Sequence, residues 1–212
     1  LRGTGLMRIG STTGITASGA TGQIQTTTRS FSTTGRYSYE SRSSQVTGDG
    51  IPSTIGALIV RDTATTLTLS KTIRVTDSLR FNYGKLILST FDLNTSTVKN
   101  YKDTNYVVTN STGALKIRNV ANTDVVFPVG PSTSAYNPVT LNNIGTPDTF
   151  AVKVATGAPT GVAVSPRLDS AINRNWTIVE DVAGGSSVTV TPQWIASDAN
   201  AQFLSTYCAV IH

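Results

Sequence analysis

Few residues of this chain have side chains suited to catalysis. Its 212 residues include one histidine, His212, and one cysteine, Cys208. A Ser-His-Asp or Cys-His arrangement would depend on His212, the last residue, and chain ends are poorly ordered. The adjacent acids Glu180 and Asp181 lie on a predicted strand, where neighbouring side chains face opposite ways, so they do not form a carboxylate pair across a cleft. We therefore expect a protein that is not an enzyme.

Metal and cofactor sites are equally sparse in the sequence. One histidine and one cysteine leave too few ligands for a zinc cluster. Calcium would need several oxygen ligands from one loop, and nearly all acidic residues are isolated. No glycine-rich phosphate loop leads from a strand into a helix. We expect no cofactor and no metal ion.

Aromatic residues are the remaining candidates for chemistry, because they can stack on sugar rings. Tyr37 and Tyr39 share one face of a predicted strand, as do Phe81 and Tyr83. The alternative is that these rings fill the core. Phe81 belongs to a row of apolar residues that should face the core, so Tyr83 should face inward as well or lie at a corner. We favour core packing and keep Tyr37, Tyr39 and Tyr83 as candidates for carbohydrate stacking.

The positive net charge could indicate an anionic partner, but a solvated polar surface is the favoured interpretation. The chain has 17 basic and 12 acidic residues, a net charge of +5. The basic residues are spread along the chain without a run, and no nucleic-acid-binding module is present. No apolar stretch approaches the length of a membrane-spanning segment. We expect neither a nucleic-acid partner nor a membrane span.

Short β-strands are the elements that position these residues. High threonine content with few Glu and Lys residues favours strands over helices, and no segment has a convincing helical pattern. Between residues 57 and 93, apolar and polar residues alternate in bursts, as on strands with one buried side. The bursts are Leu58/Val60, Leu67/Leu69, Ile73/Val75, Leu79/Phe81, Leu86/Leu88 and Phe91/Leu93.

These bursts recur about every 20 residues, three to a period. This pattern predicts coils of a three-faced parallel β-solenoid, or β-helix. A meander of hairpins is the alternative, but the stretch has no Asn-Gly or Asp-Gly pair of the kind that hairpin turns favour. The matching pairs are Leu58 with Leu79, Leu67 with Leu86 and Ile73 with Phe91, and the neighbouring periods add Tyr37/Tyr39, Val46, Ile51 or Ile55, Val98 and Tyr106/Val108.

The predicted solenoid covers residues 1–108. Residues 1–35 are rich in Gly, Ser and Thr and should form an irregular first part, with weak strands at 6–9 and 23–25. This part begins without an obvious cap. The polar stretch 99–105 marks the fading of the period and hence a domain boundary.

Longer alternating strands follow from about Gly113. They predict an antiparallel Ig-like β-sandwich over residues 109–212, which makes the whole chain all-β. Trp176 and Trp194 should fill its core. Pro128 and Pro138 remove ladder donors, so their strands should lie at edges or carry bulges. The predicted strands are 114–120, 125–130, 137–142, 149–155, 173–179, 187–193 and 206–211.

Several segments have a distinctive sequence: 15–31, 45–55 with the ladder behind it, 125–131, 136–143, 145–154, 173–178, 184–186 and 193–194. Together they resemble segments of large secreted and cell-surface proteins of the Bacteroidota. The resemblance implies export by the type IX secretion system, β-solenoid and Ig-like modules, and no catalysis. Neither the signal peptide nor the sorting domain of such substrates is found, so we expect a piece of a longer chain or a processed subunit.

The resemblance also draws attention to O-glycosylation, because exported Bacteroidota proteins use an Asp-Ser/Thr-apolar pattern for it. The pattern occurs here at Thr63, Ser78 and Ser170. Thr63 and Ser78 fall at the ends of strand bursts, where a glycan can be accommodated. An accidental match is the alternative in a chain so rich in Thr and Ser.

The expected function is that of a non-catalytic structural or adhesive protein, extracellular or on the outer cell surface. An uncapped solenoid end would let it assemble with copies of itself into a filament or surface layer. It could equally be a spacer that contacts neighbouring domains of a longer adhesin. A carbohydrate-binding module that recognises cell-surface glycans is the alternative.

Overall fold

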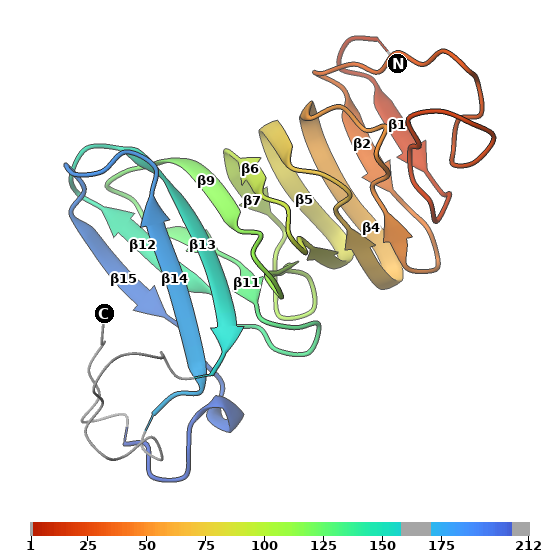
Figure 1. Cartoon of the computed structure of the whole chain (residues 1–212). Helices are drawn as coiled ribbons and strands as arrows, with labels where there is room; N and C mark the ends of the chain where they lie inside the picture. The colour runs from red at the N-terminus through yellow and green to blue at the C-terminus, as the bar shows by residue number, and fades with distance from the viewer. Residues whose placement is uncertain (1, 158–170, 205–212) are drawn as a thin grey trace.

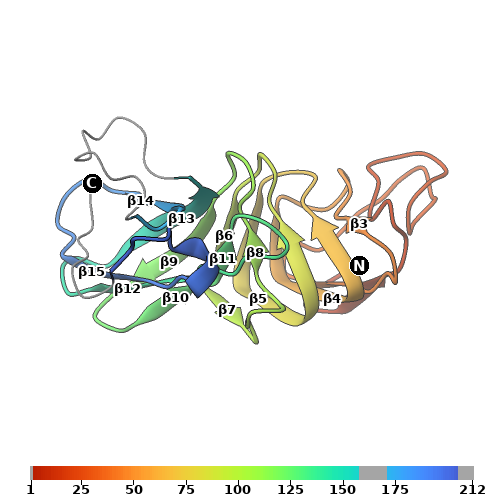
Figure 2. The ribbon, with the colours of Figure 1, turned by 90° about the horizontal axis from the view of Figure 1, so that it is seen from below.

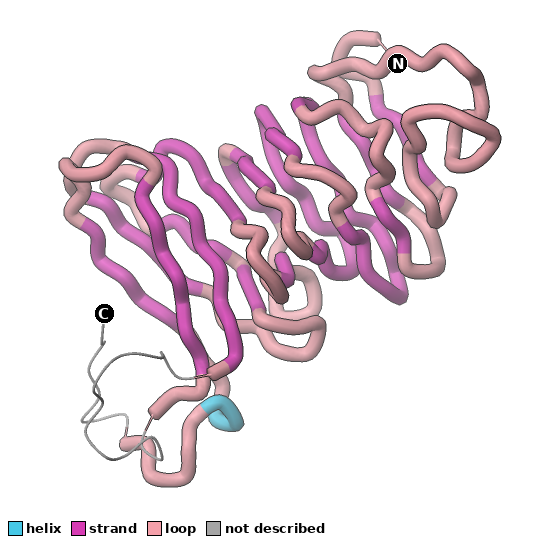
Figure 3. Tube along the Cα trace, in the orientation of Figure 1, coloured by secondary structure: helices cyan, strands magenta, loops and turns pink. Residues whose placement is uncertain are grey.

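The chain folds into β-strands that follow one another along a single stack (Figure 1). The structure, a computed structural model, describes residues 2–157 and 171–204, apart from the side chains of residues 62–65. Within these residues the only helix is a three-residue 3₁₀ turn, η2 (Ala196–Asp198) (Figure 3). The prediction of an all-β fold is confirmed.

The first part is a parallel β-solenoid of about four turns (Figure 2). Its strands form three faces, and each of the long strands β4 and β5 bends around corners to serve all three. The first face continues in β1, β2 and β7, the second in β3 and β8, and the third in β6. The strands are β1 (Leu6–Ile9), β2 (Arg36–Tyr39), β3 (Gln45–Val46), β4 (Thr54–Thr68), β5 (Ile73–Ile87), β6 (Leu93–Thr95), β7 (Thr97–Lys99) and β8 (Val107–Val108).

The coil period predicted from the sequence is confirmed by the strand register. Leu58 lies opposite Leu79, and Leu67 opposite Leu86, in parallel pairs between β4 and β5. The parallel pairing excludes a meander of hairpins for this part of the described chain. The third predicted pair was wrong by two residues, because Ile73 lies opposite Leu93 instead of Phe91.

The inner position of β3 is polar. Gln45, and not the predicted Val46, lies opposite Leu67 and is buried, whereas Val46 is 38% exposed. The Gln45 amide donates to the carbonyls of Ile9 (2.9 Å) and Ser11 (2.7 Å), so its burial leaves no donor unpaired. The same shift of one residue occurs at β8, where Val107 lies opposite Leu86 in place of Tyr106 or Val108.

Two glycines allow the first coils to approach each other closely. Gly14 has φ +65° and Gly48 has φ +79°, a region that other residues rarely adopt. A Cβ on Gly14 would lie 2.2 Å from the Val46 carbonyl oxygen, and a Cβ on Gly48 would lie 2.2 Å from that of Ile15. These glycines therefore form a tight corner between the first coils. Residues 23–25, predicted as a weak strand, form a loop instead.

The C-terminal part contains two antiparallel sheets. The first is β9–β13–β14, which extends the third face because β9 pairs in parallel with β6. The second is β10–β12–β15. The bounds are β9 (Leu115–Val120), β10 (Val125–Phe127), β11 (Val129–Gly130), β12 (Val139–Asn143), β13 (Asp148–Thr156), β14 (Arg174–Glu180) and β15 (Val188–Pro192). Six of the predicted strands are found, and residues 206–211 lie outside the described residues.

Pro128 divides one predicted strand between two sheets. Before it, β10 is an edge strand of the second antiparallel sheet, as predicted. After it, β11 pairs in parallel with β8 and adds to the solenoid's second face. Pro138 only precedes β12, which is a central strand. Trp176 packs against the core as predicted, whereas Trp194 follows β15 and contacts Phe203 edge-on at 5.8 Å.

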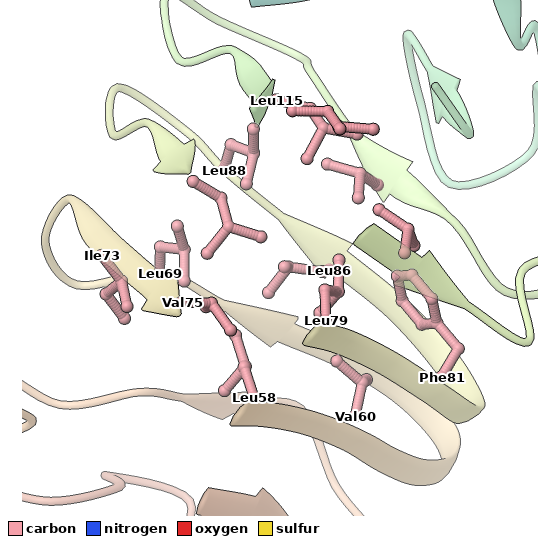
Figure 4. Packing of buried hydrophobic residues seen from close by; sticks show 14 of the residues in the cluster. Leu58, Val60, Leu69, Ile73, Val75, Leu79, Phe81, Leu86, Leu88 and Leu115 are labelled. Carbon is pink, nitrogen blue, oxygen red and sulfur yellow. The ribbon is translucent and has the colours of Figure 1, made fainter. Parts of the chain in front are cut away.

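A single hydrophobic core runs through both parts. Figure 4 shows a section of it, in which Leu58 to Leu88 of the solenoid pack near Leu115. The cluster begins at Ile9, passes through Leu79 and Leu115, and ends at Val154. Parallel pairing also continues beyond residue 108 into β9 and β11. The predicted boundary at 108/109 therefore lies inside one continuous core, and antiparallel pairing begins only with β10, β12 and β13.

A truncation in the solenoid tests whether this core is cooperative. Leu79 is fully buried between Leu58 and Val98 of the adjacent coils. We expect Leu79→Ala to lower the free energy of unfolding by about 2–5 kcal/mol. The loss should appear equally in circular dichroism and in the fluorescence of Trp176 and Trp194, which lie only in the C-terminal part.

The matched control is Arg80→Ala, an exposed position next along the same strand. It should change the free energy of unfolding by less than about 0.5 kcal/mol. A Leu79→Ala variant whose tryptophan signal does not move would show that the two parts unfold independently.

Candidate functional site

A groove of about 530 Å³ lies at one corner of the solenoid. Its walls come from the corners of β4 and β5 and from the loop that joins β7 to β8. The lining combines aromatic rings, side-chain amides and two cations. The lining residues are Arg61, Phe81, Asn82, Tyr83, Asn100, Tyr101, Lys102 and Asn105.

Tyr83 is exposed because β5 carries a bulge at this corner. Val60 lies opposite Phe81, but the next residue of β4, Arg61, lies opposite Tyr83, so β5 has one extra residue there. The bulge ends the simple alternation that would have placed Tyr83 on the side of Phe81. Phe81 is fully buried and Tyr83 is 53% exposed. Of the two predicted positions for Tyr83, the corner is confirmed and the inward position was wrong.

Tyr37 and Tyr39 are core residues. Both rings are fully buried, and their hydroxyls donate to the carbonyls of Ser32 (2.7 Å) and Thr47 (2.8 Å). Burial raises the pKa of Tyr37 to about 12 and raises the pKa of Tyr39 well above its ordinary value. Carbohydrate stacking on this pair was therefore wrong, and the core alternative is confirmed.

The loop wall of the groove is held in place by backbone hydrogen bonds. Lys102 and Asn105 exchange two of them, 3.0 and 2.9 Å long. Lys85 reaches from β5 and donates to the Thr104 carbonyl at 3.2 Å. Its ammonium also lies 5.2 Å from the ring centroid of Tyr106. The wall is thus braced against the solenoid.

Tyr106, at the end of this loop, holds it to the core. Its ring is 1% exposed and lies 5.1 Å from the ring of Tyr136, and its hydroxyl donates to the Ser132 carbonyl at 2.8 Å. Burial raises the pKa of Tyr106 and of Tyr136 to about 12, and nearby Asp103 adds to both shifts. The loop is therefore positioned before any ligand binds.

The electrostatic character of the groove is cationic. Arg61 and Lys102 line it, and no acidic residue does. Arg61 lies 3.7 Å from a Glu40 carboxylate oxygen, and Glu40 also pairs with Arg8 at 3.3 Å. Lys102 makes no salt bridge with any described residue. An anionic ligand would therefore meet two cations: Arg61, which already pairs with Glu40, and Lys102, which has no acidic partner among the described residues.

Asn105 is the most enclosed polar residue of the lining. It is 4% exposed, and its side-chain amide makes no hydrogen bond with the part of the chain that the structure describes. Asn82 and Asn100 lie nearby and are exposed. The sequence indicated only a polar stretch at 99–105 and did not point to these residues as a site.

The predicted glycosylation residues have different positions. Ser78 is 1% exposed, and its hydroxyl donates to the Asp77 carboxylate at 3.3 Å. The folded chain leaves no room for a glycan on this oxygen, so the expected accessibility of Ser78 was wrong. The side chain of Thr63 and the whole of Ser170 lie outside the described residues.

The described residues were also compared with the requirements of a metal site and of a membrane-spanning helix. Among the described residues, no group of three or more His, Cys, Asp or Glu side chains could hold a metal ion. In the same part of the chain, no helix has the length and apolarity needed to cross a membrane. Cys208 and His212 lie outside the described residues.

A buried ion pair braces the C-terminal sheets, and the sequence pattern did not reveal it. Asp198 in η2 is 2% exposed and pairs with Arg174 of β14. Asn137 donates to the Asp198 carboxylate and accepts from Arg174 Nε at 2.8 Å. The Asn137 carbonyl accepts from the Trp176 indole at 3.0 Å. Every member has a partner within the network, so its role is structural.

The comparisons with known proteins give no relative for this chain. No family model matches it, and no curated protein or solved structure matches it either.

Removing one partner of the buried ion pair should be costly. In Arg174→Met the Asp198 carboxylate stays buried without its counterion, and we expect a loss of about 3–5 kcal/mol in the free energy of unfolding. Urea denaturation followed by circular dichroism measures it. The double variant Arg174→Met/Asp198→Leu should recover part of the loss, because no unpaired charge remains. Equal losses in both variants would contradict this account.

The buried tyrosines predict a loss of stability in alkali. Tyr37, Tyr106 and Tyr136 have a pKa of about 12 when folded and near 10 when unfolded. Above pH 10 the unfolded chain therefore loses protons that the folded chain retains, and stability declines as the pH rises from about 10 to about 12. Absorbance titration of tyrosinate in native and urea-unfolded protein, with denaturation curves across this range, measures both effects. Identical native and unfolded titration curves would contradict it.

Proposed function

We propose that this chain is a non-catalytic structural or adhesive module of the cell surface or the extracellular space. The observation that carries the proposal is the single core that joins the solenoid to the antiparallel sheets. Such a stack is stiff, because each coil is held by the coils on either side. A stiff module suits a spacer in a longer adhesin or a subunit of a filament or surface layer.

The cellular context in this proposal comes from the sequence. The resemblance to large secreted Bacteroidota proteins supports export by the type IX secretion system and assignment of the C-terminal sheets to an Ig-like sandwich. O-glycosylation at Thr63 belongs to the same proposal. The partners would be further copies of this chain or neighbouring domains.

The N-terminal end of the solenoid is the surface for self-assembly in this proposal. Part of it carries a cap, contrary to expectation. The Gln23 side chain accepts hydrogen bonds from the amides of Gly10 (3.0 Å) and Ser11 (3.2 Å), and Arg29 donates to Thr16 Oγ1 at 2.8 Å. The strand β1 has β2 as its only strand neighbour among the described elements. An open strand edge of this kind can pair with another chain.

A proline in β1 tests self-assembly through this edge. The carbonyls of Gly5 and Ile9 accept from β2, so the amide of Arg8, which alternates with them, faces the open side. We expect the wild type to associate at high concentration and Arg8→Pro to remain monomeric, because the proline removes that donor. Sedimentation velocity and electron microscopy measure association.

The matched control is Arg8→Ala. It loses the same 3.3 Å ion pair with Glu40 but keeps the backbone amide, so it should associate like the wild type. A wild type that stays monomeric at every concentration would rule out self-assembly and leave the spacer role.

Carbohydrate binding is the second proposed function. The observation that favours it is the exposed ring of Tyr83 in a groove that also contains three asparagines. Aromatic faces with a few convergent polar groups are typical of small-molecule sites. Calorimetry with oligosaccharides, using the wild type and Tyr83→Ala, tests this function.

A further inference from the structure

We propose that the groove beside Tyr83 binds an acidic saccharide, a glycan that bears carboxylate or sulfate groups. This inference rests on the carbohydrate-binding function proposed above and adds the chemical class of the ligand. It follows from the combination of a stacking ring, an unpaired enclosed amide and two cations in one groove.

The stacking surface is the ring of Tyr83. The bulge in β5 holds this residue at the corner, 53% exposed, while the next ring along, Phe81, stays in the core. Tyr101 lines the groove from the loop wall and is half-buried. A sugar ring placed against Tyr83 therefore meets a second aromatic side chain at the edge of the groove.

The enclosed side-chain amide of Asn105 can form hydrogen bonds with a ligand in the groove. Only 4% of the residue is exposed, and no described residue accepts from or donates to its side chain. The amide is therefore free to bond a ligand hydroxyl or carboxylate without first breaking a bond within the described protein. Asn82 and Asn100 offer further amides at the exposed rim.

The cations determine the ligand's charge. Arg61 and Lys102 line the groove without an acidic residue among the lining residues, and Asp103, which follows Lys102, is exposed outside it. Glu40 shares its carboxylate between Arg61 and Arg8, at 3.7 and 3.3 Å. A guanidinium and an ammonium in this setting favour a carboxylate or sulfate over a neutral sugar.

A single-stranded nucleic acid also combines aromatic stacking with cations. The groove favours a saccharide because its lining has three asparagines and only two cations. Amides match the hydroxyls of a sugar, whereas a nucleic-acid channel needs a positive track along the phosphates. The experiment therefore includes a nucleic-acid probe.

Binding of four probes to the full chain tests the inference. The probes are an oligogalacturonate, a heparin-derived sulfated oligosaccharide, the neutral maltohexaose and a single-stranded oligothymidylate, measured by calorimetry at one salt concentration. We expect binding of at least one acidic oligosaccharide, with maltohexaose and oligothymidylate at least about tenfold weaker. The first two probes distinguish a carboxylate from a sulfate ligand.

Three variants locate the site. Tyr83→Ala and Lys102→Ala should each weaken binding of the acidic probe about tenfold, because they remove the stacking ring and the unshared cation. Lys99→Ala is the matched control, since Lys99 is an exposed cation that does not line the groove, and it should bind like the wild type. Circular dichroism verifies that each variant is folded.

The outcomes separate the two proposals. Equal binding of maltohexaose, unaffected by Lys102→Ala, would overturn the acidic ligand and keep carbohydrate binding. Equal binding of oligothymidylate, or equal loss in Lys99→Ala, would overturn both in favour of nonspecific attraction of anions. Absence of binding to all four probes would also overturn both.

Discussion

The stacking of parallel coils is the constraint on which the rest of this structure depends. A single coil cannot bury its inner side chains alone, so Leu58, Leu79 and Val98 are buried only because their coils lie on one another. Polar side chains reinforce the same stacking. Arg118 reaches across coils to the carbonyl of Val75 at 2.8 Å and to the hydroxyl of Ser96 at 2.5 Å. The outer surface is thereby left free to vary.

The C-terminal sheets continue this stack in antiparallel form. β9 still pairs in parallel with β6, and the reversal comes only with β13. Pro128 lets one chain segment serve the second antiparallel sheet in β10 and the solenoid in β11. The ion pair of Arg174 with Asp198 then fixes the base of β14 against the chain that follows β15. The solenoid and the C-terminal sheets thus share one hydrophobic core, where an interface between two separate domains was expected.

The corners of the solenoid are the positions at which side chains can gather to bind a ligand. On the flat faces, alternate side chains are either buried or spread over a stiff surface. At the corner after Phe81, a bulge turns Tyr83 outward, and the braced loop 100–105 brings Lys102 and Asn105 to the same groove. The regular coils thus keep the protein stiff, and the bulge and the loop provide the side chains of the proposed binding site.

The sequence by itself determined the solenoid, because its period is local and repeated: Leu58 with Leu79 and Leu67 with Leu86 are found as predicted. The tertiary structure decided what alternation cannot encode. Alternation assigns a face only along a straight strand, and the bulge in β5 interrupts it. The sequence therefore left Tyr83 between the core and a corner, and it did not predict the groove. The pairing of Asn137 with Asp198 joins residues 61 positions apart. Contacts at such separations leave no periodic trace in the sequence and arise only when the chain packs.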